Sequence, residues 1–133
     1  MQDFELDSRP VSLPDADQCF PRILSLTEDE SHIRMRLEIT SELAWFGGHF
    51  PGQPVLPGVV QLHWAVQAAQ ACFGFSTVPA ELKRLKFKSI VVPPRELDLA
   101  ISQIGDDAVR FEFSHGETKN SEGSLLFDEV VAC

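Results

Sequence analysis

The stretch PGVVQLHWAVQAAQACFG, residues 57–74, decides how the rest of the chain must fold. It starts with a proline, which suits the first turn of a helix, and it ends at a glycine, which is typical of a helix end. The expected apolar face consists of Val59, Leu62, Val66, Ala69 and Phe73. Further alanines and Trp64 widen this face and leave only a thin polar stripe of His63, Gln67 and Gln70. The pattern predicts a helix over residues 57–73 that other elements enclose.

Segments with strand character lie on both sides of this helix. Apolar and polar residues alternate over residues 22–26 and 32–39, which predicts a hairpin. Further strands are expected near residues 82–92, 97–104, 108–113 and 124–131. The expected breaks between them are residues 93–94, 105–107 and 116–123. Two strands, one long helix and four strands predict an α+β fold in which a curved antiparallel sheet wraps the helix. Because such a sheet leaves an edge, and edges are usually paired or covered, we expect a dimer.

Length, charge and cysteine usage exclude several classes of protein. The 133 residues suit one domain, 1–133, whose first 20 residues are expected to form an irregular arm. The net charge of −9 argues against general nucleic-acid binding. The sequence has no apolar run of the roughly 20 residues that a membrane helix needs, and its acidic N-terminus does not resemble a signal peptide. Three widely separated cysteines suit neither a disulfide framework nor a zinc site, so we expect a cytoplasmic protein without a bound metal.

The segment before the helix is rich in glycine and proline. Residues 45–58 read WFGGHFPGQPVLPG, a density of helix and strand breakers that predicts an ordered loop. The loop contains His49 and leads into the helix start, where unpaired backbone N–H groups carry a partial positive charge. Gly58 has no side chain to block these groups, so an anionic oxygen could bind there close to His49. Spacing alone leaves structural roles open for both His49 and His63.

Residues 48–59, GHFPGQPVLPGV, resemble the G-H-F-P-G-x-P-x-x-P-G-V signature of the hotdog-fold 3-hydroxyacyl-(acyl carrier protein) dehydratases of fatty-acid synthesis. The resemblance implies a hotdog fold and a dimer with active sites at its interface. It also implies that His49 is the catalytic histidine and that the Gly58 amide holds the thioester carbonyl oxygen. His63 stands where the family has a catalytic Glu or Asp. In this departure the helix resembles a divergent branch of dehydratases that includes those of aryl-polyene-type pathways.

The reaction that the resemblance implies is dehydration of a 3-hydroxyacyl thioester to the 2-enoyl thioester, in fatty-acid or polyene- or polyketide-type biosynthesis. His49 would take the C2 proton, the Gly58 N–H would stabilise the enolate oxygen, and His63 would help the C3 hydroxyl leave. No cofactor is expected, because the substrate is carried on the phosphopantetheine of acyl carrier protein or coenzyme A. A hotdog thioesterase and a non-catalytic acyl-thioester-binding subunit remain the alternatives. The thioesterase is disfavoured because residues 46–73 contain no carboxylate, the nearest being Glu42 just upstream.

Two further sets of residues are candidates for contacts with the substrate and its carrier. Candidate substrate contacts are Phe46, Phe50, Val55, Leu56, Trp64 and Gln67. An ordinary core role is at least as well supported for the five apolar residues, and for Gln67 the pattern favours hydrogen bonds to neighbouring backbone groups. Candidate docking residues for an acidic carrier protein are Lys83, Arg84, Lys86 and Lys88, with Arg95 nearby. A solvated strand face is the alternative interpretation of this basic cluster. We expect a homodimer or higher homo-oligomer with no nucleic-acid or membrane partner.

Overall fold

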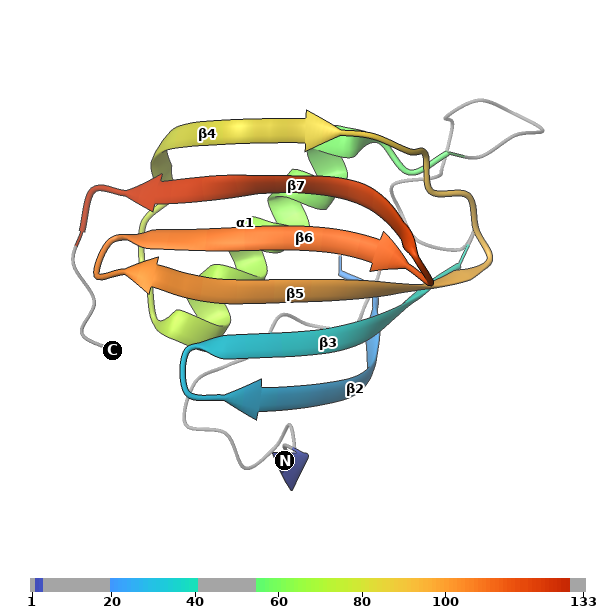
Figure 1. Cartoon of the computed structure of the whole chain (residues 1–133), viewed down its shortest axis with the longest axis horizontal. Coiled ribbons are helices and arrows are strands. Elements are labelled where there is room, and N and C mark those ends of the chain that lie inside the picture. The colour runs from blue at the N-terminus through green and yellow to red at the C-terminus, as the bar shows by residue number, and fades with distance from the viewer. Residues whose placement is uncertain (1, 4–19, 41–54, 130–133) are drawn as a thin grey trace.

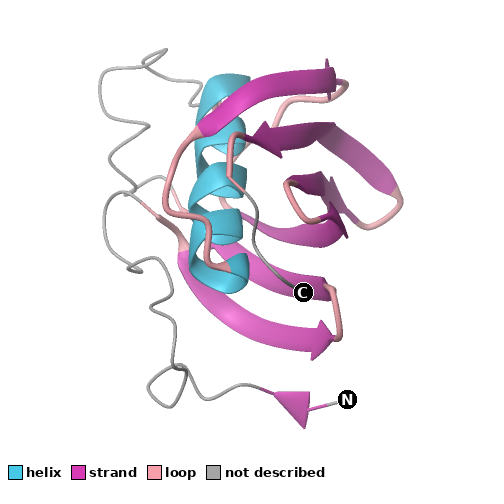
Figure 2. Cartoon of the chain, turned by 90° about the vertical axis from the view of Figure 1, so that its left-hand side faces the viewer, coloured by secondary structure: helices cyan, strands magenta, loops and turns pink. Residues whose placement is uncertain are grey.

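The computed structural model describes residues 2–3, 20–40 and 55–129. One helix, α1 (Gly58–Phe73), packs against a single sheet of seven strands. The strands are β1 (Gln2–Asp3), β2 (Arg22–Asp29), β3 (His32–Ile39), β4 (Pro79–Phe87), β5 (Arg95–Gly105), β6 (Ala108–His115) and β7 (Thr118–Phe127). They follow the order β1-β2-β3-β5-β6-β7-β4, and every neighbouring pair is antiparallel. Figures 1 and 2 show the sheet curving around α1, which confirms the predicted α+β hotdog arrangement.

The core lies between α1 and the concave face of the sheet. Strand β3 alternates as the sequence predicts, with every second residue from Ile33 to Ile39 buried. The facing residues of β5 and β6 are equally buried, among them Leu99 and Phe111. Trp64 of α1 is completely buried among them, and its ring meets that of Phe20 edge-on at a centroid distance of 6.1 Å. Burial of each such side chain contributes about 1.5–3 kcal/mol, so this layer fixes where α1 lies on the sheet.

The predicted helix ends where expected, and its buried face matches the prediction in part. Its buried residues are Val60, Gln61, Trp64, Ala65, Ala68 and Ala69, whereas Val59 is 68% exposed. Trp64, Ala65, Ala68 and Ala69 belong to the predicted face, whereas Val60 and Gln61 do not. The small alanines let the helix backbone approach the sheet. The larger Leu62 and Val66 are only partly buried against the core, and together with Val59 they also line a groove. Within one chain the helix is therefore not enclosed, because part of its apolar surface borders an open groove. Pro57 caps the helix and is not its first residue.

The predicted turn over residues 116–123 is wrong. The chain turns at Gly116, whose φ is +57°, and β7 begins at Thr118. Strand β7 is paired on both sides, with β6 and with β4, and it buries Asn120, Ser121 and Glu122. A run of polar residues usually indicates a loop, but here each of the three has hydrogen-bond or ion-pair partners inside the protein.

Other strand bounds also differ from the prediction. Strand β2 continues to Asp29, so the hairpin turn is shorter than expected. Strand β4 ends at Phe87, and residues 88–92 leave the strand to form a wall beside the start of α1. Within the expected N-terminal arm, β1 pairs with β2, while residues 4–19 lie outside the described residues. In the part of the chain that the structure describes, α1 is too short to span a membrane.

Candidate functional site

The start of α1 presents free backbone amides. The Pro57 carbonyl accepts hydrogen bonds from the Val60 and Gln61 amides at 3.1 and 3.3 Å, and no side chain caps the helix. Among the described residues the amides of Gly58 and Val59 have no hydrogen-bond partner. These two N–H groups therefore remain available at the positive end of the helix, as the sequence predicts for Gly58.

A cavity of about 220 Å³ lies beside these amides. It is lined by Val55, Leu56, Pro57, Gly58, Gln61, Phe87, Lys88, Ser89 and Ile90. The Leu56 amide donates to the Val91 carbonyl at 2.8 Å, which fixes the segment before the helix against the segment after β4. Of the expected substrate contacts, Val55 and Leu56 thus lie with Gly58 in one cavity.

The Phe87 ring packs directly on Gly58. A Cβ atom added to Gly58 would lie 2.7 and 2.8 Å from two ring atoms of Phe87, closer than real Cβ contacts come. A side chain at position 58 would therefore require the Phe87 ring to move, which favours glycine here. The ring is itself half-exposed, and it forms one side of the cavity.

Three consecutive polar residues of β7 hold the opposite wall of the cavity. The Asn120 carbonyl accepts from the amides of Lys88 and Ser89, at 2.8 and 3.2 Å. The Ser121 hydroxyl donates to Oε1 of Gln61 at 2.7 Å. Glu122 lies 3.3 Å from Nζ of Lys88. Asn120, Ser121 and Glu122 are not predicted as site residues from the sequence, because they fall in the expected turn over residues 116–123. The signal for them in the sequence is a polar run that leads directly into the apolar end of β7.

Glu122 is the best-defined charge near the cavity. Its hydrogen bond with Lys88 holds the pKa of Glu122 below its usual value, and the nearby charges of Arg110 and Lys119 act in the same direction. The Arg110 guanidinium approaches the same carboxylate at 3.4 Å. Glu122 is consequently ionised at neutral pH and restrains the Lys88 ammonium beside the cavity.

His63 faces a different region from Gly58. It is exposed and borders a groove of about 270 Å³ lined by Val59, Leu62, His63, Val66, Val78, Pro79 and Leu82. His63 comes five positions after Gly58 in the helix, which places the two residues about 140° apart around the helix axis and about 7.5 Å apart along it. A single chain therefore does not bring these two predicted residues into one cavity.

The remaining predicted contacts have diverse positions. His49, Phe46 and Phe50 lie outside the described residues. Trp64 belongs to the core and lines neither the cavity nor the groove. Gln67 is half-buried, and its Oε1 has no hydrogen-bond partner among the described residues.

The predicted docking cluster follows the outer edge of the sheet. Lys83, Arg84 and Lys86 are exposed on β4, and none forms an ion pair within the described residues. The pairing of β4 with β7 is irregular between Lys83 and Lys86, and Arg84 has a φ of 53°. Lys88 differs from the other three because it is paired with Glu122.

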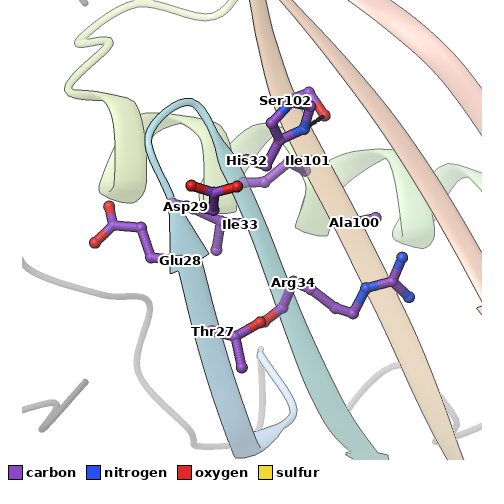
Figure 3. A pocket seen from close by; sticks show the side chains of 9 residues that line it. All are labelled: Thr27, Glu28, Asp29, His32, Ile33, Arg34, Ala100, Ile101 and Ser102. Carbon is purple, nitrogen blue, oxygen red and sulfur yellow. Dashed lines mark hydrogen bonds between the residues drawn. The ribbon is translucent and has the colours of Figure 1, made fainter. Parts of the chain in front are cut away.

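A larger hollow lies elsewhere, over β2, β3 and β5. It has a volume of about 540 Å³ and shares no residue with the cavity at Gly58. Figure 3 shows the His32 ring against Ser102, with Nδ1 and Oγ 2.9 Å apart, and the Arg34 side chain extending over β5. None of the described residues that line this hollow is a predicted site residue. Across the described ranges, no group of three or more His, Cys, Asp or Glu residues could hold a metal.

Comparisons with known proteins give the family. The family model of the ApeI dehydratases (ApeI-like) matches residues 25–124. A 3-hydroxyacyl-[acyl-carrier-protein] dehydratase FabZ from Fusobacterium nucleatum is 31% identical over 120 residues, which cover 84% of this chain and 77% of the relative. The FabZ of Legionella pneumophila (strain Lens) is 32% identical over 89 residues, so the match spans only 59% of each protein.

Solved structures agree with these sequence matches. The dehydratase heterocomplex ApeI:P from Xenorhabdus doucetiae contains a chain that is 26% identical, with a TM-score of 0.73 over 80% of this chain and 96% of that one. The dehydratase domain of a mycocerosic acid synthase-like polyketide synthase, at 15% identity and a TM-score of 0.65, shares the fold. Since the family model covers most of the sequence and the fold agrees, this chain belongs to the ApeI-like dehydratase family.

Proposed function

We propose that this protein removes water from a 3-hydroxyacyl thioester to give the 2-enoyl thioester. The observation that carries the proposal is the free amide of Gly58, which opens into a cavity at the start of α1. Gly58 belongs to the stretch GHFPGQPVLPGV, residues 48–59, which resembles the signature of 3-hydroxyacyl dehydratases. The FabZ relatives named above act on 3-hydroxyacyl groups bound to acyl carrier protein, which supports the same substrate class here.

The reaction divides among three groups. His49, in its neutral form, takes the proton from C2, and the electron pair of that bond moves onto the thioester oxygen. The Gly58 N–H holds this oxygen, and one such donor contributes about 10²–10³ in rate. The electron pair then returns from this oxygen to form the C2=C3 double bond, the C3–O bond breaks, and the hydroxide leaves as water with a proton from His63 or from a water that His63 orients. A histidine suits this step because its imidazole is a common general acid and base in enzymes.

A second copy of the chain supplies His63 to the site. Strand β4 is at an edge of the sheet, and the groove beside it is apolar. Val59, Val78 and Leu82, which line this groove, are 68%, 70% and 43% exposed. An unpaired edge beside exposed apolar side chains favours pairing of two copies across β4, which buries both. The exposed His63 then faces the cavity of the other copy. Because the related X. doucetiae structure is a heterocomplex, a related chain is the alternative partner.

The substrate arrives on a phosphopantetheine arm, and no other cofactor takes part. Lys83, Arg84 and Lys86 are the basic groups best placed to attract an acidic carrier protein or the phosphate of the arm. Lys88 contributes less, because Glu122 already balances its charge. Location in the cytoplasm remains a prediction from the sequence.

The test is turnover by the purified chain of 3-hydroxyacyl thioesters on acyl carrier protein and on coenzyme A. We expect formation of the enoyl product, and loss of this activity in His49→Ala with an unchanged circular dichroism spectrum. A saturated acyl thioester is offered in parallel. Release of free thiol would instead indicate a thioesterase, and binding of both thioesters without turnover would indicate a binding subunit. Full activity in His49→Ala would contradict the proposed mechanism.

A further inference from the structure

Gln61 is a buried polar residue on the helix that carries Gly58. It is only 2% exposed, yet it lines the cavity beside the Gly58 amide. Its side chain has a single hydrogen-bond partner in the described part of the chain, Ser121, whose hydroxyl donates to Oε1 at 2.7 Å. Among the described residues, Oε1 of Gln67 is the only buried side-chain N or O atom without a partner. The Nε2 group of Gln61 is therefore not sealed in the core, and it is accessible where this residue lines the cavity.

The geometry of the helix directs Gln61 toward Gly58. Gln61 comes three residues after Gly58, so the two share one side of α1, a single turn apart. Side chains on a helix tilt toward its N-terminus, which brings the Gln61 amide back over the turn that contains Gly58. Both residues line the same cavity, as this direction requires.

Ser121 determines which end of the amide faces the cavity. Since the hydroxyl of Ser121 is bonded to Oε1, the Nε2 amino group points away from β7. Strand β7 is paired on both sides, and Ser121 itself is completely buried, so the orientation is fixed before any ligand binds. The adjacent Asn120 holds the other wall of the same cavity through its carbonyl. Gln61 is thus an oriented N–H donor in a cavity that has a backbone N–H donor beside it.

We propose that Gln61 is a second donor to the thioester oxygen, acting together with the Gly58 amide, and that Ser121 is its positioning residue. The inference rests on the proposed dehydration, and it deepens the account of that site. As the C2 proton leaves, charge collects on the thioester oxygen, and two donors that are already in place stabilise it without reorganisation. The neutral amide of a glutamine suits this position because it donates without adding a charge that would bind the ground state equally well.

Two substitutions separate this role from a structural one. Gln61→Met keeps the length of the side chain and removes the donor. Gln61→Glu keeps an acceptor for Ser121 but presents a carboxylate to the oxyanion. We expect kcat to fall about 10²-fold in Gln61→Met and further in Gln61→Glu, with KM changed by no more than about twofold.

The matched control is Gln70→Met, the same substitution in the same helix. Gln70 donates from Nε2 to the Thr77 carbonyl at 2.9 Å, at the other end of α1, and it does not line the cavity. We expect this variant to lose some stability and to keep the parental kcat. A parental kcat in both Gln61 variants would overturn the proposal. So would a loss that appears in KM alone, because that would assign Gln61 to ground-state binding of the substrate.

A spectroscopic readout makes the test independent of turnover. The 2-enoyl thioester product, labelled with ¹³C at C1, is bound to the parent protein and to Gln61→Met, and its carbonyl stretch is measured by infrared difference spectroscopy. Two donors polarise the carbonyl more than one, so we expect a higher stretching frequency in the variant. Equal frequencies would contradict the contact. If the parent chain itself shows no dehydration, the proposed function fails, whereas an active parent with an unaffected Gln61→Met refutes only the role of Gln61.

Discussion

The contact between Gly58 and Phe87 predicts that Gly58→Ala changes the free energy of unfolding in opposite directions with and without the Phe87 ring. In Gly58→Ala the new methyl group would lie 2.7 and 2.8 Å from two atoms of the Phe87 ring. The backbone of Gly58 is helical and has no positive φ, so alanine meets no backbone strain there. The only obstacle is the ring, which is half-exposed and is therefore able to move aside.

Two opposing effects determine the size of the change. Overpacking of this kind costs about 1–3 kcal/mol, and the exposure of the ring favours the lower half of that range. Alanine in place of glycine at a helical position stabilises by about 0.5–1 kcal/mol. We therefore expect Gly58→Ala to destabilise the protein slightly, by about 0–1.5 kcal/mol. In a Phe87→Ala background the clash is absent, and the same substitution should stabilise by about 0.5–1 kcal/mol.

The assay is a double-mutant cycle in the free energy of unfolding, measured with denaturant at one fixed protein concentration. The predicted coupling between the two positions is about 1–2 kcal/mol, the cost of the clash alone. A Gly58→Ala penalty of the same size with and without the Phe87 ring would refute the reasoning. Activity should fall in the single variant, because a displaced ring narrows the cavity into which the Gly58 amide opens.

Three further predictions concern the walls and edge of the site. Glu122→Gln removes the carboxylate whose pKa is lowered by its hydrogen bond with Lys88. The ionised carboxylate stabilises the folded protein at pH values above the ordinary glutamate pKa, and the variant should lack this stabilisation. The parent should have the higher free energy of unfolding at pH 7, and the difference from the variant should disappear as the pH falls below about 4. A difference that is constant with pH would refute the stabilising role of the ionised Glu122. Asn120→Ala removes the side-chain amide that is hydrogen-bonded to Nδ1 of His115 and to the Ile90 carbonyl. The free energy of unfolding should fall by about 1–3 kcal/mol, measured by thermal or chemical unfolding. An unchanged free energy of unfolding would show that water replaces the Asn120 amide. Leu82→Glu places a charge in the apolar groove and should yield folded monomers without activity in sedimentation and turnover assays, whereas Ile104→Glu, at another exposed apolar position, should leave both unchanged; a dimeric Leu82→Glu would exclude the groove as the interface.

The helix could be predicted from local signals, because Pro57 and Gly74 mark its ends within the sequence itself. The hairpin of β2 and β3 could be predicted for the same reason, since its alternation reflects one buried face. The exact buried face of the helix could not be predicted, because its seven alanine and valine residues suit either side, and the choice depends on how closely the sheet approaches. Strand β7 was misinterpreted because its polar residues find partners on other elements, which no local pattern reveals.

The site likewise contains residues that local signals in the sequence predict and residues whose position depends on distant parts of the chain. Gly58 could be predicted, because a glycine after a Gly/Pro-rich loop and before a helix has few other uses. Gln61 could not, because its meaning depends on Ser121, which lies 60 residues later in the chain. His63 was predicted as part of the same site, yet the helix turns it to the opposite side from Gly58. In the proposed dimer, a second copy brings the two sides of the helix into one site.

Mixing two inactive variants tests this shared site most directly. His49→Ala and His63→Ala are each purified, combined in equal amounts and allowed to exchange subunits. In a mixed dimer one site has lost both histidines and the other has kept both, so dehydratase activity should return to about a quarter of the parental value. If tagged subunits prove that mixed dimers have formed and the mixture remains inactive, the two histidines do not meet across an interface, and the account is wrong.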